Sequence, residues 1–166
     1  MKNTASLSDE DLLRIIGVND YSSTATIGLS DATDPSFRAT AIARIGDTVL
    51  ILDTYLVWSC SFEEEKLTAF DEGLAKQSAQ GDILCFLIND TSGTYAYSIF
   101  SGGERVRVMS TTDGRVVADA GNTGNYESNR ETTIDRMMET IDLFLGRPFG
   151  KLTTYNTTTA TAYYNN

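Results

Sequence analysis

The sequence lacks one residue type entirely, because none of its 166 residues is histidine. This absence excludes Ser-His-Asp and Cys-His catalysis, a histidine general base and any zinc site that needs an imidazole. An enzyme with this composition would have to use carboxylates, lysine, tyrosine or an oxygen-ligated cation. Many common hydrolase mechanisms are thereby ruled out.

Cysteine and long apolar runs are also scarce. The two cysteines, Cys60 and Cys85, have no CxxC spacing and lie near apolar strand residues, so we expect buried, reduced thiols rather than a disulfide or a metal site. No segment approaches the roughly 18 apolar residues of a membrane helix, and residues 1–16 lack the apolar core of a secretion signal. We therefore expect a cytoplasmic protein that does not contact a membrane.

Positive charge is in short supply. Lysine and arginine number 13 against 23 acidic residues, which gives a net charge of −10, and 15 of the acids lie within the first ninety residues. Phosphate binding needs a basic surface, so nucleic acid is excluded as the expected partner. A cationic protein partner remains open.

Hydrophobic residues make up 41% of the chain, enough for a folded core. We expect one domain over residues 1–150, followed by an edge strand or a frayed tail over 151–166. The fold class is predicted to be α+β, mainly an antiparallel sheet with a strand meander over 83–119. Hydrophobic spacing and capping patterns predict three helices, at about 8–16, 62–79 and 130–145.

Two local patterns carry these assignments. Gly46-Asp47 joins two β-rich segments and suits a tight hairpin turn. Ser61-x-x-Glu64 has the form of a capping box, and Leu67, Phe70 and Leu74 then follow at helical spacing. The second helix is therefore predicted to start near residue 62.

Glycine-bearing turns set the expected register of the meander. They are placed at Ser92-Gly93, at Gly102-Gly103 and in a three-residue loop from Thr112 to Gly114. This register pairs Phe86 with Ile99, Ile99 with Val106 and Val108 with Ala118. It puts Val106 and Val108 on an apolar face, and Phe100, Arg105 and Arg107 on a more polar face, with Arg107 opposite Asp119.

These residues suggest a candidate site. The more polar face could be a shallow groove that is floored by Phe100, lined by Arg105 and Arg107, and suited to an acidic group. The simpler interpretation is that both arginines form the solvent side of an outer strand, where an exposed ion pair contributes about 0–1 kcal/mol.

Acidic residues of the second helix form another candidate surface, made of Glu63, Glu64, Asp71 and Glu72. Acids at a helix start are also expected for electrostatic reasons, and no calcium loop or phosphate-binding motif is present, so we expect no metal and no cofactor. Asp53, at the end of an apolar strand, is the one carboxylate in a position typical of an active site, although such an Asp commonly caps a turn.

Two resemblances accompany this pattern. The order helix, hairpin, helix, meander, helix looks like the profilin and roadblock arrangement of a sheet covered by helices. The stretch from "LAKQSAQGDILCFLIN" to "DAGNTGNYE" is similar to small bacterial domains grouped with toxin-immunity proteins. Its landmarks are Gly103, Arg105, Arg107, Gly121 and Glu127. The second resemblance implies a cytoplasmic protein that neutralises a toxin by binding it.

Three functions therefore compete. The first is a non-enzymatic, acidic protein-binding module, in the form of an immunity-type inhibitor of a basic protein. The second is a small-molecule or peptide binder that uses the sheet face near Phe100, Arg105 and Arg107. The third is a carboxylate-based enzyme around Asp53, for which no second acid or positioned base is evident.

Overall fold

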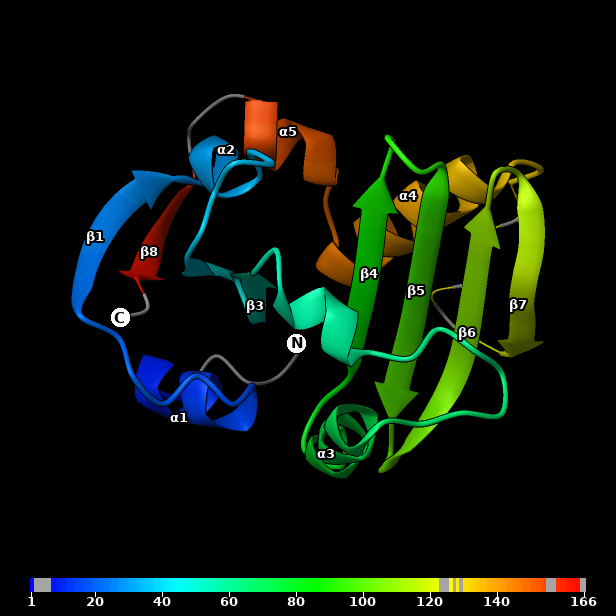
Figure 1. Ribbon diagram of the computed structural model, residues 1–166, viewed down its shortest axis with the longest axis horizontal. Coiled ribbons are helices and arrows are strands. Elements are labelled where there is room, and N and C mark those ends of the chain that lie inside the picture. The colour runs from blue at the N-terminus through cyan, green and yellow to red at the C-terminus, as the bar shows by residue number, and fades with distance from the viewer. Residues whose placement is uncertain (2–6, 123–125, 127, 129, 155–157, 165–166) are drawn as a thin grey trace. The chain divides into compact units, whose positions relative to one another are not determined.

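The computed structural model describes residues 1–166 apart from 2–6, 123–125, 127, 129, 155–157 and 165–166. It contains two antiparallel sheets of four strands each together with helices, so the predicted α+β class is confirmed (Figure 1). Residue contacts divide the chain into two compact units. The first comprises Met1–Leu56 and Phe149–Asn166, and the second comprises Val57–Pro148.

The first unit contains a sheet of strand order β1-β8-β2-β3. Its strands are β1 (Ser23–Gly28), β8 (Thr159–Tyr164), β2 (Thr40–Ile45) and β3 (Thr48–Leu52), and its helices are α1 (Asp9–Ile15), α2 (Leu29–Ala32) and α5 (Phe149–Thr154). The expectation of an edge strand or a frayed tail after residue 150 is wrong for β8, which pairs with both β1 and β2. Ala160 and Ala162 of β8 are buried. The strands that pair with β8 lie far away in the sequence, so no local pattern predicts its inner position.

Local patterns in the first unit predicted its elements well. The hairpin is confirmed, because Ile45 pairs with Thr48 and Gly46 has a φ of +63°, as a two-residue turn with glycine first requires. The helix expected at 8–16 is α1, and the Ser8 hydroxyl oxygen accepts the N–H of Asp11 at its N-terminus.

The second unit contains the predicted meander. Its strands are β4 (Ile83–Asn89), β5 (Thr94–Ser101), β6 (Glu104–Thr112) and β7 (Arg115–Gly121), which lie side by side in chain order. The helix expected at 130–145 is α4 (Thr133–Leu145), which lies behind this sheet in Figure 1. Met137 and Ile141 are buried in its core-facing stripe, and Gly146 ends it with a φ of +70°.

The helix expected at 62–79 begins later than predicted. It is α3 (Ala69–Gln77), preceded by the short 3-10 helix η1 (Leu56–Ser59) and an irregular segment. The true capping box is Thr68 with Asp71, not Ser61 with Glu64, and Leu67 is exposed rather than buried. Residues 60–68 instead cross the front of the sheet in Figure 1, and we call them the crossing loop.

The predicted register fails between β5 and β6. The turn at Gly102-Gly103 and the pair Phe100 with Arg105 are confirmed, but a β-bulge then leaves Val106 unpaired and sets Ile99 opposite Arg107. A bulge shifts every later residue to the other face of the sheet. Arg105 and Arg107 therefore point to opposite faces, which corrects the expected common face.

The register between β6 and β7 also differs from the prediction. The turn is the two-residue Asp113-Gly114, with Thr112 opposite Arg115, and not a three-residue loop. Asp113 and Gly114 both have positive φ, of 51° and 72°, which is the conformation of a type I′ turn.

A second bulge in β7 moves the pairing further along the strands. Val108 lies opposite Ala120 rather than Ala118, and Arg107 lies opposite Gly121 rather than Asp119. Val108 is buried on the face that it shares with Ser98, so it does not join the apolar face predicted for it.

The connection between β4 and β5 is longer than the expected two-residue turn. Asn89 pairs with Thr94, and Phe86 pairs with Tyr97 rather than with Ile99. Because this shift is two residues, both strands keep their predicted faces.

Candidate functional site

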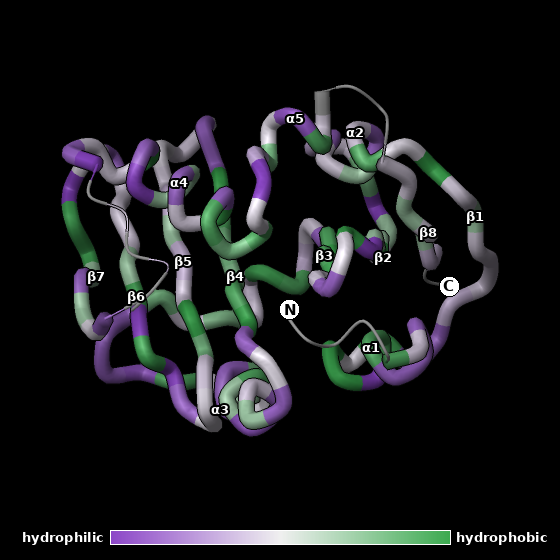
Figure 2. Tube along the Cα trace, turned by 180° about the vertical axis from the view of Figure 1, so that it is seen from behind, coloured by the Kyte–Doolittle hydropathy of each residue, from purple (hydrophilic) through white to green (hydrophobic). Residues whose placement is uncertain are grey.

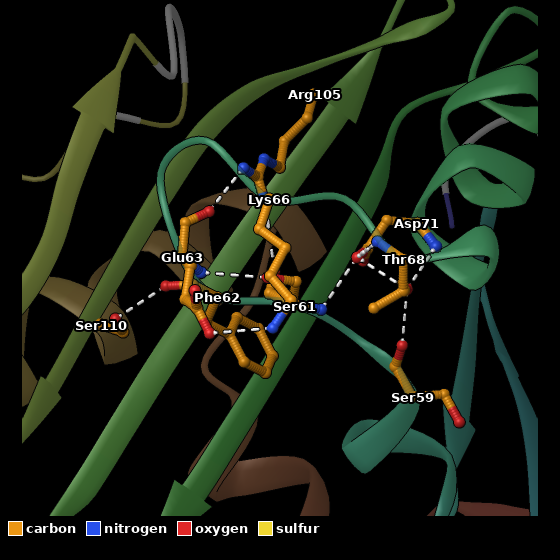
Figure 3. Close-up of polar contacts among 9 residues, drawn as sticks. All are labelled: Ser59, Ser61, Phe62, Glu63, Lys66, Thr68, Asp71, Arg105 and Ser110. Atoms are coloured by element: carbon orange, nitrogen blue, oxygen red, sulfur yellow. Dashed lines mark hydrogen bonds and ion pairs between the residues drawn. The ribbon is translucent and has the colours of Figure 1, made fainter.

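The crossing loop is held to the sheet by one arginine. Arg105 Nη1 donates to the carbonyl oxygen of Ser61 at 3.0 Å, and Nη2 donates to that of Glu63 at 2.6 Å (Figure 3). Nη2 also donates to the carbonyl oxygen of Glu64 at 2.7 Å. A guanidinium carries five N–H donors in a fixed plane, so a single side chain can satisfy several carbonyls at once. Arg105 therefore fixes the backbone path of the loop.

A buried carboxylate ties the two ends of the loop together. Asp71 is 0% exposed, and its Oδ2 accepts the backbone N–H groups of Ser61 at 2.9 Å and Thr68 at 2.8 Å (Figure 3). The Thr68 hydroxyl also lies 2.8 Å from Oδ2 and accepts the N–H of Asp71 at 3.1 Å. One oxygen thus joins the start and the end of the loop, and its removal would leave these two backbone N–H groups without that acceptor.

Two further contacts join the loop to the last two strands of the sheet. The Ser110 hydroxyl on β6 donates to the carbonyl oxygen of Phe62 at 2.9 Å. The N–H of Asp119, on the edge strand β7, donates to Glu64 Oε1 at 3.0 Å. Glu64 thus covers part of an edge whose backbone groups would otherwise be available for pairing.

The outward side of the crossing loop is acidic. Glu63, Glu64 and Glu65 are exposed, and Figure 2 shows this part of the loop in the purple of hydrophilic residues. Lys66 lies 3.4 Å from Glu63, but both side chains are more than 60% exposed, so this ion pair contributes little. The loop therefore presents carboxylates to solvent on a backbone that the sheet holds in place.

Two apolar side chains, one before and one after these acids in the sequence, are exposed. Trp58, in η1, is 67% exposed, and Leu67, at the other end of the loop, is 42% exposed. Tryptophan is enriched among the residues that contribute most to protein–protein binding. The exposed Trp58 is therefore a candidate contact for a partner protein.

The groove predicted on the sheet does not form. Phe100 is 0% exposed, and Arg105 is used by the crossing loop, which occupies this face. Arg107 lies on the opposite face, is 4% exposed, and forms the expected ion pair with Asp119. The three residues of the predicted groove are therefore not available together. Phe100 is buried, and Arg105 and Arg107 lie on opposite faces of the sheet.

Arg107 has structural partners on its own face. Nη1 donates to the carbonyl oxygens of Val108 at 3.0 Å and Ala120 at 2.9 Å, and the guanidinium lies 5.9 Å from the ring centre of Tyr97. Arg136 of α4 approaches Asp119 at 3.7 Å. Arg107 therefore joins two strands beneath a helix, where it is not accessible to a ligand.

The predicted acidic residues fall into two groups. Glu63 and Glu64 lie on the exposed loop and Glu72 on the exposed side of α3, whereas Asp71 is buried and holds the loop. Sequence reasoning missed the contacts of Arg105 with the loop carbonyls, for which no local pattern exists. It could have found the role of Asp71, because Thr68-x-x-Asp71 is a capping-box pattern.

Asp53 has the turn-capping role rather than a catalytic geometry. Its Oδ1 accepts the N–H groups of Tyr55 at 2.8 Å and Leu56 at 2.9 Å, and its Oδ2 accepts the hydrogen of the Thr40 hydroxyl at 2.6 Å.

Across the residues that the structure describes, no three His, Cys, Asp or Glu side chains are grouped to hold a metal ion. Of the landmark residues, Glu127 lies outside the described part of the chain.

No protein-family model, curated protein or solved structure matches this chain. The resemblances to the profilin and roadblock arrangement and to toxin-immunity domains therefore stay predictions. Within the described ranges, none of the helices has the length and apolar character needed to cross a membrane. Function has to be inferred from the chain's own geometry.

Proposed function

We propose that this chain is a non-enzymatic protein-binding module that uses the crossing loop to bind a cationic partner protein in the cytoplasm. An immunity-type inhibitor of a basic toxin is the form of this function that we favour. The observation that carries the proposal is the set of three hydrogen bonds from Arg105 to the carbonyls of Ser61, Glu63 and Glu64. These bonds order the backbone from which the exposed carboxylates project.

Ordering before binding matters because a flexible loop loses conformational entropy when a partner fixes it. In this chain the loop is already held by Arg105, Asp71 and Ser110, so less of the binding energy is spent on ordering. The net charge of −10 would speed encounter with a basic protein, and complementary charge would favour it over other partners.

Exposed apolar residues before and after the acids in the sequence supply the other part of the proposed binding surface. Charge pairs at the rim of an interface mainly steer association, whereas buried aromatic side chains contribute most of the affinity. Trp58 is available for this role because it is largely exposed. Two free thiols, at Cys60 and Cys85, are consistent with a reducing cytoplasm.

Affinity capture from a lysate of the source organism tests the proposal with two charge-matched baits. One bait carries Glu63→Gln, Glu64→Gln and Glu65→Gln, and the control carries Glu10→Gln, Glu104→Gln and Glu131→Gln. Both sets change the charge by +3 at exposed positions (three neutralised acids each), and glutamine keeps an oxygen that can accept the N–H of Asp119.

The proposal predicts a basic protein that the native chain and the control retain and that the loop variant loses. It also predicts that high salt weakens this capture steeply. Equal loss with both baits would indicate non-specific charge attraction and would contradict a defined site. Capture that depends on neither the loop nor salt would contradict the proposal as well.

A further inference from the structure

The outer strand of the first sheet, β1, has an open row of backbone groups. β1 pairs with β8 on one side and lies at the outer edge of that sheet (Figure 1). The N–H of Leu29, directly after β1, donates to the carbonyl oxygen of Thr158 at 2.9 Å, in the same register as the strand pair. Backbone groups alternate in direction along an antiparallel strand, so odd-numbered residues of β1 face β8. Two even-numbered threonines, Thr24 and Thr26, therefore direct their N–H and C=O groups away from the sheet.

The chain itself closes both ends of this edge. At one end the N–H of Ser22 donates to the carbonyl oxygen of Tyr164 at 2.8 Å, and at the other end the N–H of Gly28 donates to Asp31 Oδ2 at 3.2 Å. Among the residues that the structure describes, none bonds to the outward groups of the two threonines between these ends. The open part of the edge thus offers two N–H donors and two C=O acceptors.

The usual protections of an edge strand are absent from β1. Native edge strands carry charged side chains, proline or a bulge that discourage pairing with another chain. Residues 21–30 contain no charged residue and no proline, and the register of β1 with β8 is regular. By contrast, Met1 exchanges hydrogen bonds with Val49 along β3, and β7 has both a bulge and the contact with Glu64. The edge of β1 is therefore suited to pairing with a further strand.

We propose that this edge pairs with β1 of a second copy of the chain, antiparallel about a two-fold axis at Ala25. In this register Thr24 of each copy lies opposite Thr26 of the other, so the outward groups of the two copies meet. Two N–H donors in each copy then make four hydrogen bonds across the axis. An axis at Thr24 or at Thr26 would instead use Ser22 or Gly28, whose N–H groups already have acceptors.

The side chains of the strand suit this register. Residues 23–26 are all exposed. Thr–Thr pairs across two strands are favourable, and the two copies of Ala25 meet at the closely spaced, non-hydrogen-bonded position, where a small side chain fits.

Charge favours a second copy as the occupant of this edge. Two copies that each carry a net charge of −10 repel each other where acidic surfaces meet, but the paired strands would place no like charges opposite each other. A cationic partner would find no carboxylate along residues 21–30, so this edge offers it no complementary charge.

The paired edge is short, so the association should be weak and reversible. Stable interfaces bury about 1,200–2,000 Å², more than a few residues of paired strand provide. Added salt should strengthen the dimer, because it screens the repulsion between two acidic chains. This response is opposite to that expected for capture through the crossing loop. Since β1 belongs to the first unit and the loop to the second, the inference goes beyond the proposed function.

Sedimentation equilibrium of the full chain between about 10 μM and about 1 mM, at low and high salt, measures this association. The expected result is a monomer–dimer equilibrium that salt shifts toward the dimer. Thr24→Pro removes an outward N–H from each copy without removing a bond to β8, and should weaken the dimer by about tenfold or more. Thr24→Val keeps the N–H and the branched shape, so it should dimerise as the native chain does. Melting temperatures check that both variants fold.

Cysteine cross-linking tests the register without the proline variant. In a chain with Cys60→Ser and Cys85→Ser, Ala25→Cys places two thiols opposite each other at the two-fold axis, so mild oxidation should give a covalent dimer. Thr24→Cys is the matched control. Its two thiols would be diagonal neighbours, with Cα atoms beyond the roughly 7 Å that a disulfide spans, so it should cross-link far more slowly.

Four results would overturn the proposal. Three are a chain that stays monomeric over this range, a dimer that Thr24→Pro leaves unchanged, and equal cross-linking at residues 24 and 25. The fourth is a monomer that loses its captured basic protein with Thr24→Pro, which would assign the edge to that partner instead. Failure of the proposed function would leave the dimer unaffected, because dimerisation is measured on the isolated chain.

Discussion

The backbone of Gly121 lies against the carbonyl group of Val106. A Cβ on Gly121 would stand 2.0 Å from the Val106 oxygen, and the N–H of the next residue, Asn122, donates to that same oxygen at 2.9 Å. Val106 is the residue that the bulge in β6 leaves unpaired. The close approach at Gly121 thus accompanies the bulge that sends Arg105 and Arg107 to opposite faces.

Replacing Gly121 by alanine should therefore be costly. The new Cβ would meet backbone atoms, and the φ of +84° is unfavourable for any residue with a Cβ. We expect a loss of about 2–4 kcal/mol in the free energy of unfolding, measured by urea denaturation.

Gly102→Ala is the matched control. Gly102 also has a positive φ, of 62°, but a Cβ there meets nothing within 4 Å. Its cost should be only about 1 kcal/mol, from the backbone conformation alone. Equal effects of the two variants would show that the contact with Val106 is unimportant.

Much of the fold could be predicted from local patterns. The hairpin turn at Gly46, the cap at Ser8 and the stop at Gly146 each depend on residues close together in the sequence, and the structure confirms them. Gly102-Gly103 was likewise recognised as a turn. Such signals are reliable because the conformation that they specify involves only neighbouring residues.

The failures have a common physical origin in contacts between distant segments. The bulge at Val106 is matched to Gly121, and β8 is paired with strands more than a hundred residues away. The start of α3 was misplaced because carbonyls that a helix would use are taken by Arg105 from another part of the chain. The expected groove failed for the same reason, since one bulge changes the face of every residue beyond it.

Arg105→Ala tests the attachment of the crossing loop. Removing the guanidinium leaves three carbonyl oxygens without their donor, so we expect a loss of about 1–3 kcal/mol and faster amide exchange over residues 61–66. This reverses the expectation for a solvent-facing arginine, whose loss would leave the melting temperature nearly unchanged. Arg115→Ala, at an exposed position of β7, should change stability by no more than about 0.5 kcal/mol. An unchanged loop in the Arg105 variant would mean that the guanidinium does not fix it.

Asp71→Ala should be among the most destabilising substitutions of an acidic residue in this chain. Two backbone donors, the N–H groups of Ser61 and Thr68, would lose their buried acceptor, whereas the Thr68 hydroxyl can still donate to the carbonyl oxygen of Ser59 at 2.7 Å. We expect a loss of about 2–5 kcal/mol in urea denaturation. The neighbouring Glu72→Ala removes the same charge from an exposed position and should have little effect. If the two variants were equally stable, Asp71 would not have the structural role that its contacts indicate.

Trp58→Ala should separate affinity from stability. Because Trp58 is 67% exposed, its truncation should change the free energy of unfolding by less than about 1 kcal/mol. If the residue anchors the partner, affinity should fall by roughly 2 kcal/mol or more, mainly through faster dissociation. Surface plasmon resonance on the captured partner would measure both rates. Unchanged dissociation would exclude Trp58 from the interface.

The most direct test of the account is the affinity of the Arg105→Ala variant for the partner that the crossing loop captures. A calorimetric titration should show weaker binding with a larger entropic penalty than for the native chain, although every carboxylate of the loop is still present, and Arg115→Ala should bind as the native chain does. If Arg105→Ala bound with native affinity while its loop exchanged freely, the ordered loop would not be the basis of binding, and the central claim would be wrong.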